Sequence, residues 1–257
     1  MAPDSSRAFL EQGHAFRSLE LVGTTAVDGA ATGRAMTRSA MSDPAWGTGA
    51  IAIMSIEVPG DGPWLTYKWH VWWELPTHWR DDHTSTYLGD VVSIVRPDLA
   101  LQYTSQTQTL YTTERLAASD KRPRVSAPKG RAVPTLDDRL EEFRIIRPRL
   151  PDSDWNIETI DHEPYLGRSA RRVRATRRPG SPTHGFRVSG FWTGVDEYEC
   201  VIDDQLQILL SVVAIVDGAP AATISVEHVI VDEPIPASTF DFSPPAGTRI
   251  AQVGEKK

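Results

Sequence analysis

The sequence predicts a mainly β protein built on one large curved antiparallel sheet or barrel. Three observations predict this class: apolar and polar residues alternate along most of the chain, turn signals separate the alternating segments at short intervals, and about a dozen such segments accompany two or three helical ones. Strands at this spacing favour an antiparallel sheet over a βαβ fold. No internal repeat divides the chain, so we expect a single domain over residues 1–257.

Length and composition are those of a globular protein. With 257 residues, 40% hydrophobic and 24% charged, the chain is long enough for a substantial core and unlike disordered, collagen-like or membrane-spanning proteins. Its single cysteine, Cys200, excludes an intramolecular disulfide framework and a zinc site built on paired thiolates. A formal charge of −7 argues against a nucleic-acid partner.

The first residues lack the pattern of an export signal. Met1–Leu21 has no cationic start followed by an apolar run, and its longest apolar stretch is Ala8–Leu10. No window of the chain reaches the ~18 apolar residues of a transmembrane helix. If the chain is complete, we therefore expect a cytoplasmic protein with no membrane span.

Residues 1–64 are expected to hold an N-terminal helix and the first strands. Pro3–Arg17 is typical of a short helix, and Ser18–Val27 and Ala50–Val58 alternate as strands. Asp28–Gly29 is a turn signal, and the small residues of Ala30–Asp43 leave a loop or a short helix open.

The segment Thr66–Leu75 carries the clearest pattern. Its odd positions form an apolar, aromatic face and its even positions a mostly polar one, because successive strand side chains point to opposite sides. The odd positions are Tyr67, Trp69, Val71, Trp73 and Leu75. An antiparallel meander is expected to follow, through the strands Trp79–Leu88, Val91–Arg96, Leu99–Thr104 and Thr109–Arg115 and the turns Gly89–Asp90 and Pro97–Asp98.

The second half repeats this organisation after a connector. Residues 117–134 are rich in Lys, Arg, Pro and Ser and predict a flexible connector, and 135–147 predict an amphipathic helix with Leu136, Leu140 and Phe143 on one side. Further strands are expected at Trp155–Asp161, Leu166–Arg177, Gly185–Phe191, Tyr198–Ile202, Leu206–Val216 and Ala221–Val231, with turns at Asp203–Asp204 and Asp217–Gly218. The Pro-rich tail, 232–257, is expected to wrap the surface.

Motifs for nucleotide, dinucleotide and serine-hydrolase chemistry are missing from the sequence. The one metal-like cluster contains His78, Asp81, Asp82 and His83, but on a strand Asp81 and His83 share a face while Asp82 points opposite. We therefore expect solvated or hydrogen-bonded side chains there and no metal site. Six arginines within Arg168–Arg178 suggest a polyanion site, yet an ion-paired, solvated face is the better interpretation in an acidic protein.

Five of the eight tryptophans lie within Trp64–Trp79. Core packing explains such a concentration, because indole rings bring a large apolar area. An aromatic stripe on a concave sheet is equally a candidate lining for an apolar ligand cavity. The two interpretations stay open and do not exclude each other.

Four segments of the chain resemble a known family. They are Trp69–Pro76 followed by Trp79–Arg80, then Asp196–Asp203, Val231–Pro236 and Phe240–Gly247. Together they are similar to the bacterial lipoprotein-carrier fold of the LolA, LppX and RseB class. That resemblance implies an unclosed antiparallel barrel with an apolar concave side lidded by two or three helices, of which 135–147 would be one. The periplasmic carriers have a lid-latching arginine before the hairpin proline, where this chain has Leu75.

The same fold occurs in cytoplasmic VioE-like enzymes of natural-product biosynthesis, which need no cofactor, and a tetronate-polyether-type cyclase is similar in kind. We therefore expect cofactor-independent cyclisation or rearrangement of a large hydrophobic small molecule of the polyketide-like, antibiotic type. The alternative is a non-catalytic carrier of a lipid or amphipathic metabolite. A regulatory module like the RseB domain, which would bind a partner peptide, is a third possibility.

The candidate site residues follow from strand parity. If Pro76 turns the chain, Trp79, Asp81, His83 and Tyr87 face the same side as the odd positions of Thr66–Leu75. Asp81 and His83 are then the acid/base candidates, and Tyr198 and His228 are possible donors from later strands. The expected ligand-binding residues are Tyr67, Trp69, Val71, Trp73, Leu75, Trp79, Tyr87, Leu140 and Phe143, with no metal and no cofactor.

Overall fold

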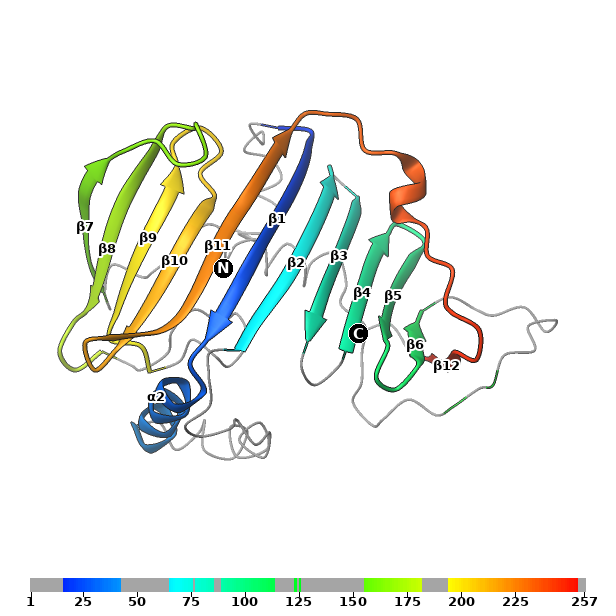
Figure 1. Cartoon of the computed structure of the whole chain (residues 1–257), viewed down its shortest axis with the longest axis horizontal. Helices are drawn as coiled ribbons and strands as arrows, with labels where there is room; N and C mark the ends of the chain where they lie inside the picture. Colours follow the sequence, from blue (N-terminus) through cyan, green and yellow to red (C-terminus); the bar gives the residue numbers. More distant parts are fainter. Residues whose placement is uncertain are drawn as a thin grey trace, which may run out of the picture. The chain divides into compact units, whose positions relative to one another are not determined.

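The computed structural model of the protein describes residues 16–42, 65–75, 77–85, 89–113, 123, 125, 155–181 and 194–253. These residues form one twelve-stranded sheet that is not closed into a barrel, in the order β12-β6-β5-β4-β3-β2-β1-β11-β10-β9-β8-β7 (Figure 1). The mainly β, unclosed architecture predicted from the sequence is confirmed. The sheet is mixed and not purely antiparallel, because β12 pairs with β6 in parallel.

The elements have the following bounds: β1 Ser18–Val27, α2 Gly29–Ser42, β2 Leu65–Glu74, β3 His78–Ser85, β4 Gly89–Arg96, β5 Leu99–Thr104, β6 Thr109–Thr112, β7 Trp155–His162, β8 Ala170–Arg177, β9 Glu197–Asp203, β10 Leu209–Val216, β11 Ala219–Val231, the 3-10 helix η2 Ala237–Phe240 and β12 Arg249–Gln252. The predicted strands among the described residues therefore all occur, with ends shifted by up to four residues, as in β8, which begins at Ala170 and not at Leu166. The turn predicted at Gly89–Asp90 is wrong, because both residues belong to β4. Residues 3–15, 50–58, 135–147 and 185–191, where further elements were expected, lie outside the described residues, as does most of the connector 117–134.

Two segments differ from the expectation. Ala30–Asp43, left open as a loop or short helix, lies largely in helix α2, whose first turn is capped by Asp28: its Oδ1 accepts a hydrogen bond from the Ala31 N–H at 2.9 Å. The C-terminal tail does more than wrap the surface. Its prolines stop at Pro245, and Arg249–Gln252 are then able to pair with β6 as β12.

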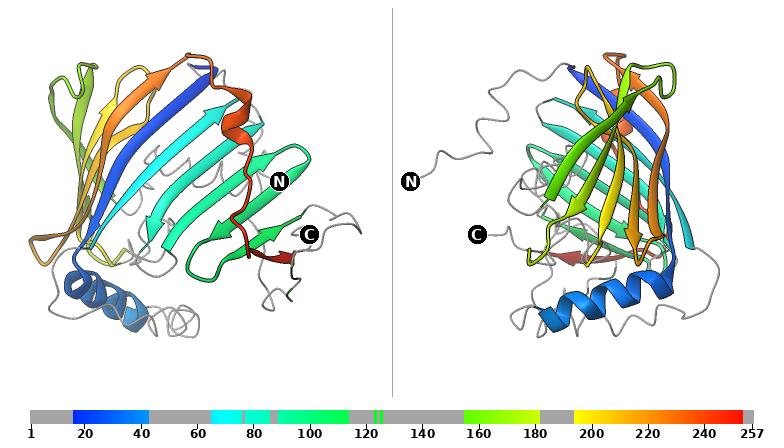
Figure 2. Two further views of the ribbon diagram at one scale, coloured as in Figure 1. Left: turned by 45° about the vertical axis from the view of Figure 1, so that its right-hand side comes forward. Right: turned by 90° about the vertical axis from the view of Figure 1, so that its left-hand side faces the viewer.

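The chain divides into two compact units. Unit 1 contains Met1–Val22, Tyr67–Glu141 and His228–Lys257, and unit 2 contains Gly23–Thr66 and Glu142–Glu227. In unit 1 the tail runs across β3, β4 and β5 on its way to β12 (Figure 2). Arg80 donates to the Thr239 carbonyl oxygen at 2.7 Å, and the Phe242 and Tyr103 ring centroids are 5.3 Å apart. The tail thus covers one face of this part of the sheet.

In unit 2, helix α2 is fixed to the sheet strands by charge and by close packing. Arg38 donates to Asp196 at 2.8 Å and to Asp217 at 2.6 Å, and Gly194 faces the Ala35 carbonyl of the helix. Asp217 and Gly218 have φ angles of 54° and 76° and form the two-residue turn between β10 and β11, as predicted.

The arginine-rich strand β8 is ion-paired, which confirms the structural interpretation of this cluster. Arg174 lies 2.9 Å from Glu199, Arg171 lies 2.9 Å from Asp204 and Arg177 lies 2.9 Å from Asp196. Because each of these guanidinium groups has a carboxylate partner, the strand is poorly suited to capture a polyanion.

Candidate functional site

Strand pairing in unit 1 gathers the predicted aromatic residues on one face. The register of β2 and β3 pairs Trp69 with His83, Val71 with Asp81 and Trp73 with Trp79. Directly opposed residues of an antiparallel pair project to the same side. Asp81 and His83 therefore share the face of Trp69, Val71 and Trp73. We call this side of β2–β6, defined by these residues and their cross-strand partners, the aromatic face.

The side chains of the aromatic face differ in how far they are buried. Trp73 and Trp79 are 0% and 4% exposed, and their rings meet edge to face with centroids 5.9 Å apart. These two indoles pack in the core, as one of the two interpretations of the tryptophan cluster predicts, and their ligand-binding roles stay predictions. Tyr67, Trp69 and Val71 are only half-buried.

Asp81 and His83 are in contact at the centre of this face. The His83 Nδ1 lies 3.2 Å from Asp81 Oδ2, and the side chains of His83 and Asp81 keep 31% and 14% of their exposure. Beside them, Ser93 is fully buried on β4 and accepts a hydrogen bond from the Gln102 amide at 3.4 Å. A carboxylate that accepts from Nδ1 holds the imidazole in the tautomer whose Nε2 is a proton acceptor. The pair is thus chemically suited to act as a general base or to bind a polar group.

The other predicted site residues lie elsewhere. Leu75 follows β2 and is half-buried, and His228 is exposed on β11. Tyr198 belongs to unit 2, where it is fully buried, with its ring centroid 5.1 Å from that of Trp155. The remaining three, Tyr87, Leu140 and Phe143, lie outside the described residues. The catalytic and ligand-binding roles of these residues stay predictions.

The metal-like spacing around β3 does not assemble a ligand set. Asp82 and His78 lie on the side opposite Asp81 and His83, where Asp82 pairs with Arg80 at 2.6 Å and His78 lies 3.8 Å from Glu74. Among the residues that the structure describes, no group of three or more His, Cys, Asp or Glu side chains is placed to hold a metal ion.

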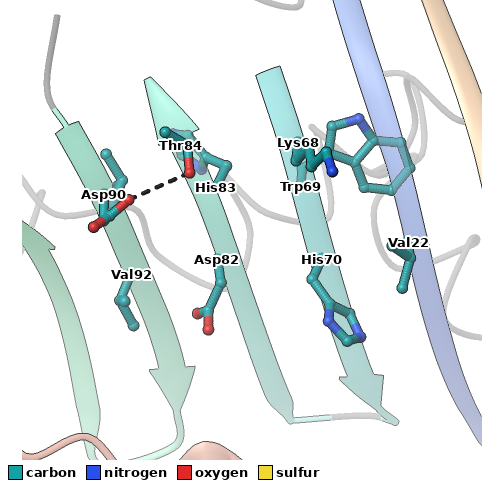
Figure 3. Close-up of a pocket in the computed structure, with 10 residues that line it drawn as sticks. Val22, Lys68, Trp69, His70, Asp82, His83, Thr84, Asp90 and Val92 are labelled. Carbon is teal, nitrogen blue, oxygen red and sulfur yellow. Dashed lines mark hydrogen bonds between the residues drawn. The ribbon is translucent and has the colours of Figure 1, made fainter. Parts of the chain in front are cut away.

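Strands β1–β4 carry a feature that sequence reasoning missed, lined by residues of both strand parities: Trp69, His83 and Val91 belong to the aromatic face, whereas Lys68, His70 and Asp82 belong to the opposite one. An open hollow of about 360 Å³ is lined by Val22, Lys68, Trp69, His70, Asp82, His83, Thr84, Asp90, Val91 and Val92 (Figure 3). Thr84 donates to Asp90 at 3.3 Å, and His70 Nε2 lies 2.7 Å from Glu20. The alternation of β2 did mark Lys68 and His70 as part of a polar face. A strand pattern predicts the side to which each side chain points, but it does not predict where the surface is hollowed.

No protein-family model matches the sequence, and no curated protein matches it. Among solved structures, an uncharacterized conserved protein from Thermus thermophilus is 7% identical, with 97% of this chain and 100% of that chain covered and a TM-score of 0.44.

Two further structures have comparable scores. The MucA/MucB complex of Pseudomonas aeruginosa is 11% identical over 93% of this chain and 60% of that chain, with a TM-score of 0.44. Lipoprotein LppX of Mycobacterium tuberculosis is 11% identical over 89% of this chain and 92% of that chain, with a TM-score of 0.40. Similarity at this level carries no information on the ligand or activity of the present chain. Within the described residues, no helix has the length and apolar character needed to cross a membrane.

Proposed function

We propose that the chain binds an apolar or amphipathic small molecule on the aromatic face and carries it unchanged. The observation behind this proposal is that Tyr67, Trp69 and Val71 stay half-exposed on the side where Trp73 and Trp79 are packed away. Adjacent apolar side chains that keep contact with solvent on one face are typical of a binding surface. The polar Asp81–His83 pair next to them would orient one end of the guest.

Paired tryptophan variants of β2 test this proposal, because Trp69 and Trp72 are half-buried on opposite faces of the same strand. Binding of a pyrene-labelled long-chain alcohol would be followed by energy transfer from tryptophan. Trp69→Ala is expected to weaken binding by about tenfold, since a stacked indole contributes on the order of 1 kcal/mol or more. Trp72→Ala should leave the affinity within about twofold of that of the unmodified protein. Equal losses in both variants, or none in either, would overturn the proposal.

A second candidate is catalysis: cofactor-independent cyclisation or rearrangement of a polyketide-like small molecule. The contact between Asp81 and His83 favours it, because an oriented imidazole is a competent general base. Incubation with an unsaturated long-chain probe, followed by mass spectrometry, separates the two candidates. Unchanged probe recovered after saturable binding supports the carrier. A product that forms with the unmodified protein but not with Asp81→Asn or His83→Ala supports the enzyme.

A further inference from the structure

The hollow on β1–β4 is lined by five ionisable side chains, and three of them already have an ionisable partner. The three pairs are His70 with Glu20 at 2.7 Å, Asp82 with Arg80 at 2.6 Å and His83 with Asp81 at 3.2 Å. Because each of these groups is already paired, it gains little from contact with a charged ligand.

The other two ionisable residues of the hollow, Lys68 and Asp90, have no ion-pair partner within the described part of the chain. Both residues are exposed. The Asp90 carboxylate accepts a hydrogen bond from the Thr84 hydroxyl at 3.3 Å and has further lone pairs to offer, while the Lys68 side chain forms no hydrogen bond to a described residue. The hollow therefore offers one ammonium group and one carboxylate, opposite in charge and both available to a ligand.

Lys68 and Asp90 lie in one row across the sheet. Thr84 on β3 is in register with Asp90 on β4, and continuation of the register that pairs Trp69 with His83 places Lys68 beside Thr84. Figure 3 shows the three side chains in this order, with Thr84 in the middle. Since neighbouring strands are ~4.8 Å apart, the Cα atoms of Lys68 and Asp90 are separated by roughly 10 Å. A molecule seated over Thr84 would therefore reach both charges.

Apolar surface lies beside this row. In the next row Asp82 is in register with Val92, and Val22 of β1 lines the same hollow (Figure 3). The hollow has a volume of about 360 Å³, and sites that take small molecules have volumes from about 300 Å³ upward. The space suits a molecule of about dipeptide size that has one apolar group.

From these observations we propose that the hollow is a second binding site, which takes a small zwitterion of about dipeptide length. The carboxylate of the ligand binds the Lys68 ammonium group, its own ammonium group binds Asp90, and its apolar side chain rests on Val22 or Val92. A simple anion would be repelled by Asp90 and a simple cation by Lys68, whereas a zwitterion satisfies both groups at once. The site is additional to the proposed function, which concerns the aromatic face.

The probe for this site is glycyl-leucine, whose two end groups are both charged at pH 7. An NMR titration in low salt would compare it with glycyl-leucinamide, which lacks the carboxylate, and with N-acetylglycyl-leucine, which lacks the ammonium group. Each blocked peptide is expected to bind roughly three- to fivefold more weakly than glycyl-leucine, because this is the effect of losing one exposed ion pair.

Substitutions of the two charged residues should change these preferences in a crossed pattern. Lys68→Gln is expected to abolish the preference for glycyl-leucine over its amide and to keep the preference over the acetylated peptide. Asp90→Asn is expected to do the reverse. Asp98→Asn is the control, because it removes a carboxylate that is 75% exposed and lies outside the hollow, and it should alter neither preference. All three variants keep Trp69, so their affinity for the pyrene-labelled alcohol should stay within about twofold of that of the unmodified protein.

The crossed pattern of the two variants would support the zwitterion site. The proposal is wrong if glycyl-leucine does not bind, if all three peptides bind equally well, or if either variant weakens all three peptides alike. A loss of alcohol binding in Lys68→Gln would contradict the assignment of the hollow as a second site. Failure of the peptides to bind leaves the proposed function untouched, because the alcohol assay measures that function separately.

Discussion

Trp79 lies directly opposite Trp73 across the β2–β3 pair, with the two ring planes at 62° to each other. On its other side Trp73 meets Phe16, whose ring is inclined at 73° with its centroid 5.8 Å away. Edge-to-face contacts of this kind add to the free energy that burial of the ring area already supplies. The three aromatic rings therefore form a buried part of the core of unit 1, at one end of the aromatic face.

Trp73→Ala is expected to lower the free energy of unfolding by about 3–5 kcal/mol, because it empties the space of a fully buried indole. Urea denaturation followed by circular dichroism would measure the loss. Trp72→Ala is the matched control: Trp72 is half-buried on the other face, stacked on His70, and its removal should cost about 1 kcal/mol. A similar cost for both variants would contradict the assignment of Trp73 to the core.

The contrast between Trp69 and Trp73 shows what the sequence of β2 could and could not predict. Alternation placed both indoles on one face, and the register of β3 added Asp81 and His83 as expected. How deeply each indole is buried was not predictable. Trp73 packs against Phe16, which precedes β1 in the chain and belongs to no pattern within β2. The same limit applies to the hollow, whose lining comes from four strands.

Elements that depend on distant partners were also beyond prediction. The four residues of β12 carry little strand signal of their own and are held by parallel pairing with β6. Helix α2 begins with glycine and is rich in small residues of mixed propensity. Its position depends on contacts with a glycine more than a hundred residues further along the chain, at Gly194.

Gly194 should tolerate no side chain. A Cβ there would lie 2.0 Å from the Ala35 carbonyl oxygen, and its φ of 76° is already unfavourable for other residues. Gly194→Ala is therefore expected to cost about 2–5 kcal/mol of unfolding free energy, from backbone strain and displacement of α2 together.

Gly180→Ala is the matched control for this substitution. Gly180 has a φ of 81°, but nothing lies within 4 Å of the position of its Cβ. Only the backbone strain remains, so thermal or urea unfolding should show a loss of about 1 kcal/mol. If the two alanine variants lose the same stability, α2 does not approach Gly194 as closely as the structure shows.

Asp196 should make the unfolding free energy of the protein depend on pH. Burial alone would raise the pKa of its carboxyl, but the Asp217 N–H and the guanidinium groups of Arg38 and Arg177 outweigh burial and lower that pKa. A carboxyl whose pKa is depressed in the folded state stabilises the fold above its unfolded pKa, near 4, and loses this contribution as the pH falls through the folded value. Asp196→Asn should therefore be less stable than the unmodified protein at pH 7, and the difference should shrink below about pH 4.

Unfolding of both proteins by urea at pH 7 and pH 3 would measure that difference. Asp98→Asn is the control, since the Asp98 side chain is 75% exposed and its carboxylate lies 3.4 Å from Arg96, a pair at the surface. Its substitution should change stability by less than about 0.5 kcal/mol at either pH. A gap between Asp196→Asn and the unmodified protein that persists undiminished at pH 3 would show that Asp196 acts through packing and not through its charge.

Cys200 gives a chemical readout of folding because it is the chain's one cysteine and it is buried in β9. Burial, and to a lesser degree the charge of Glu199, raises the pKa of its thiol to about 12, so roughly one thiol in ten thousand is ionised at pH 8. Since the thiolate is the reactive form, native protein should resist an aromatic disulfide reagent for hours, whereas labelling in urea should be complete within minutes. Cys200→Ser should abolish the signal in both conditions, and gradual labelling of the native protein should follow the rate at which β9 opens. Rapid stoichiometric labelling without denaturant would mean that β9 is exposed in solution, which the packing of this strand between β8 and β10 does not allow.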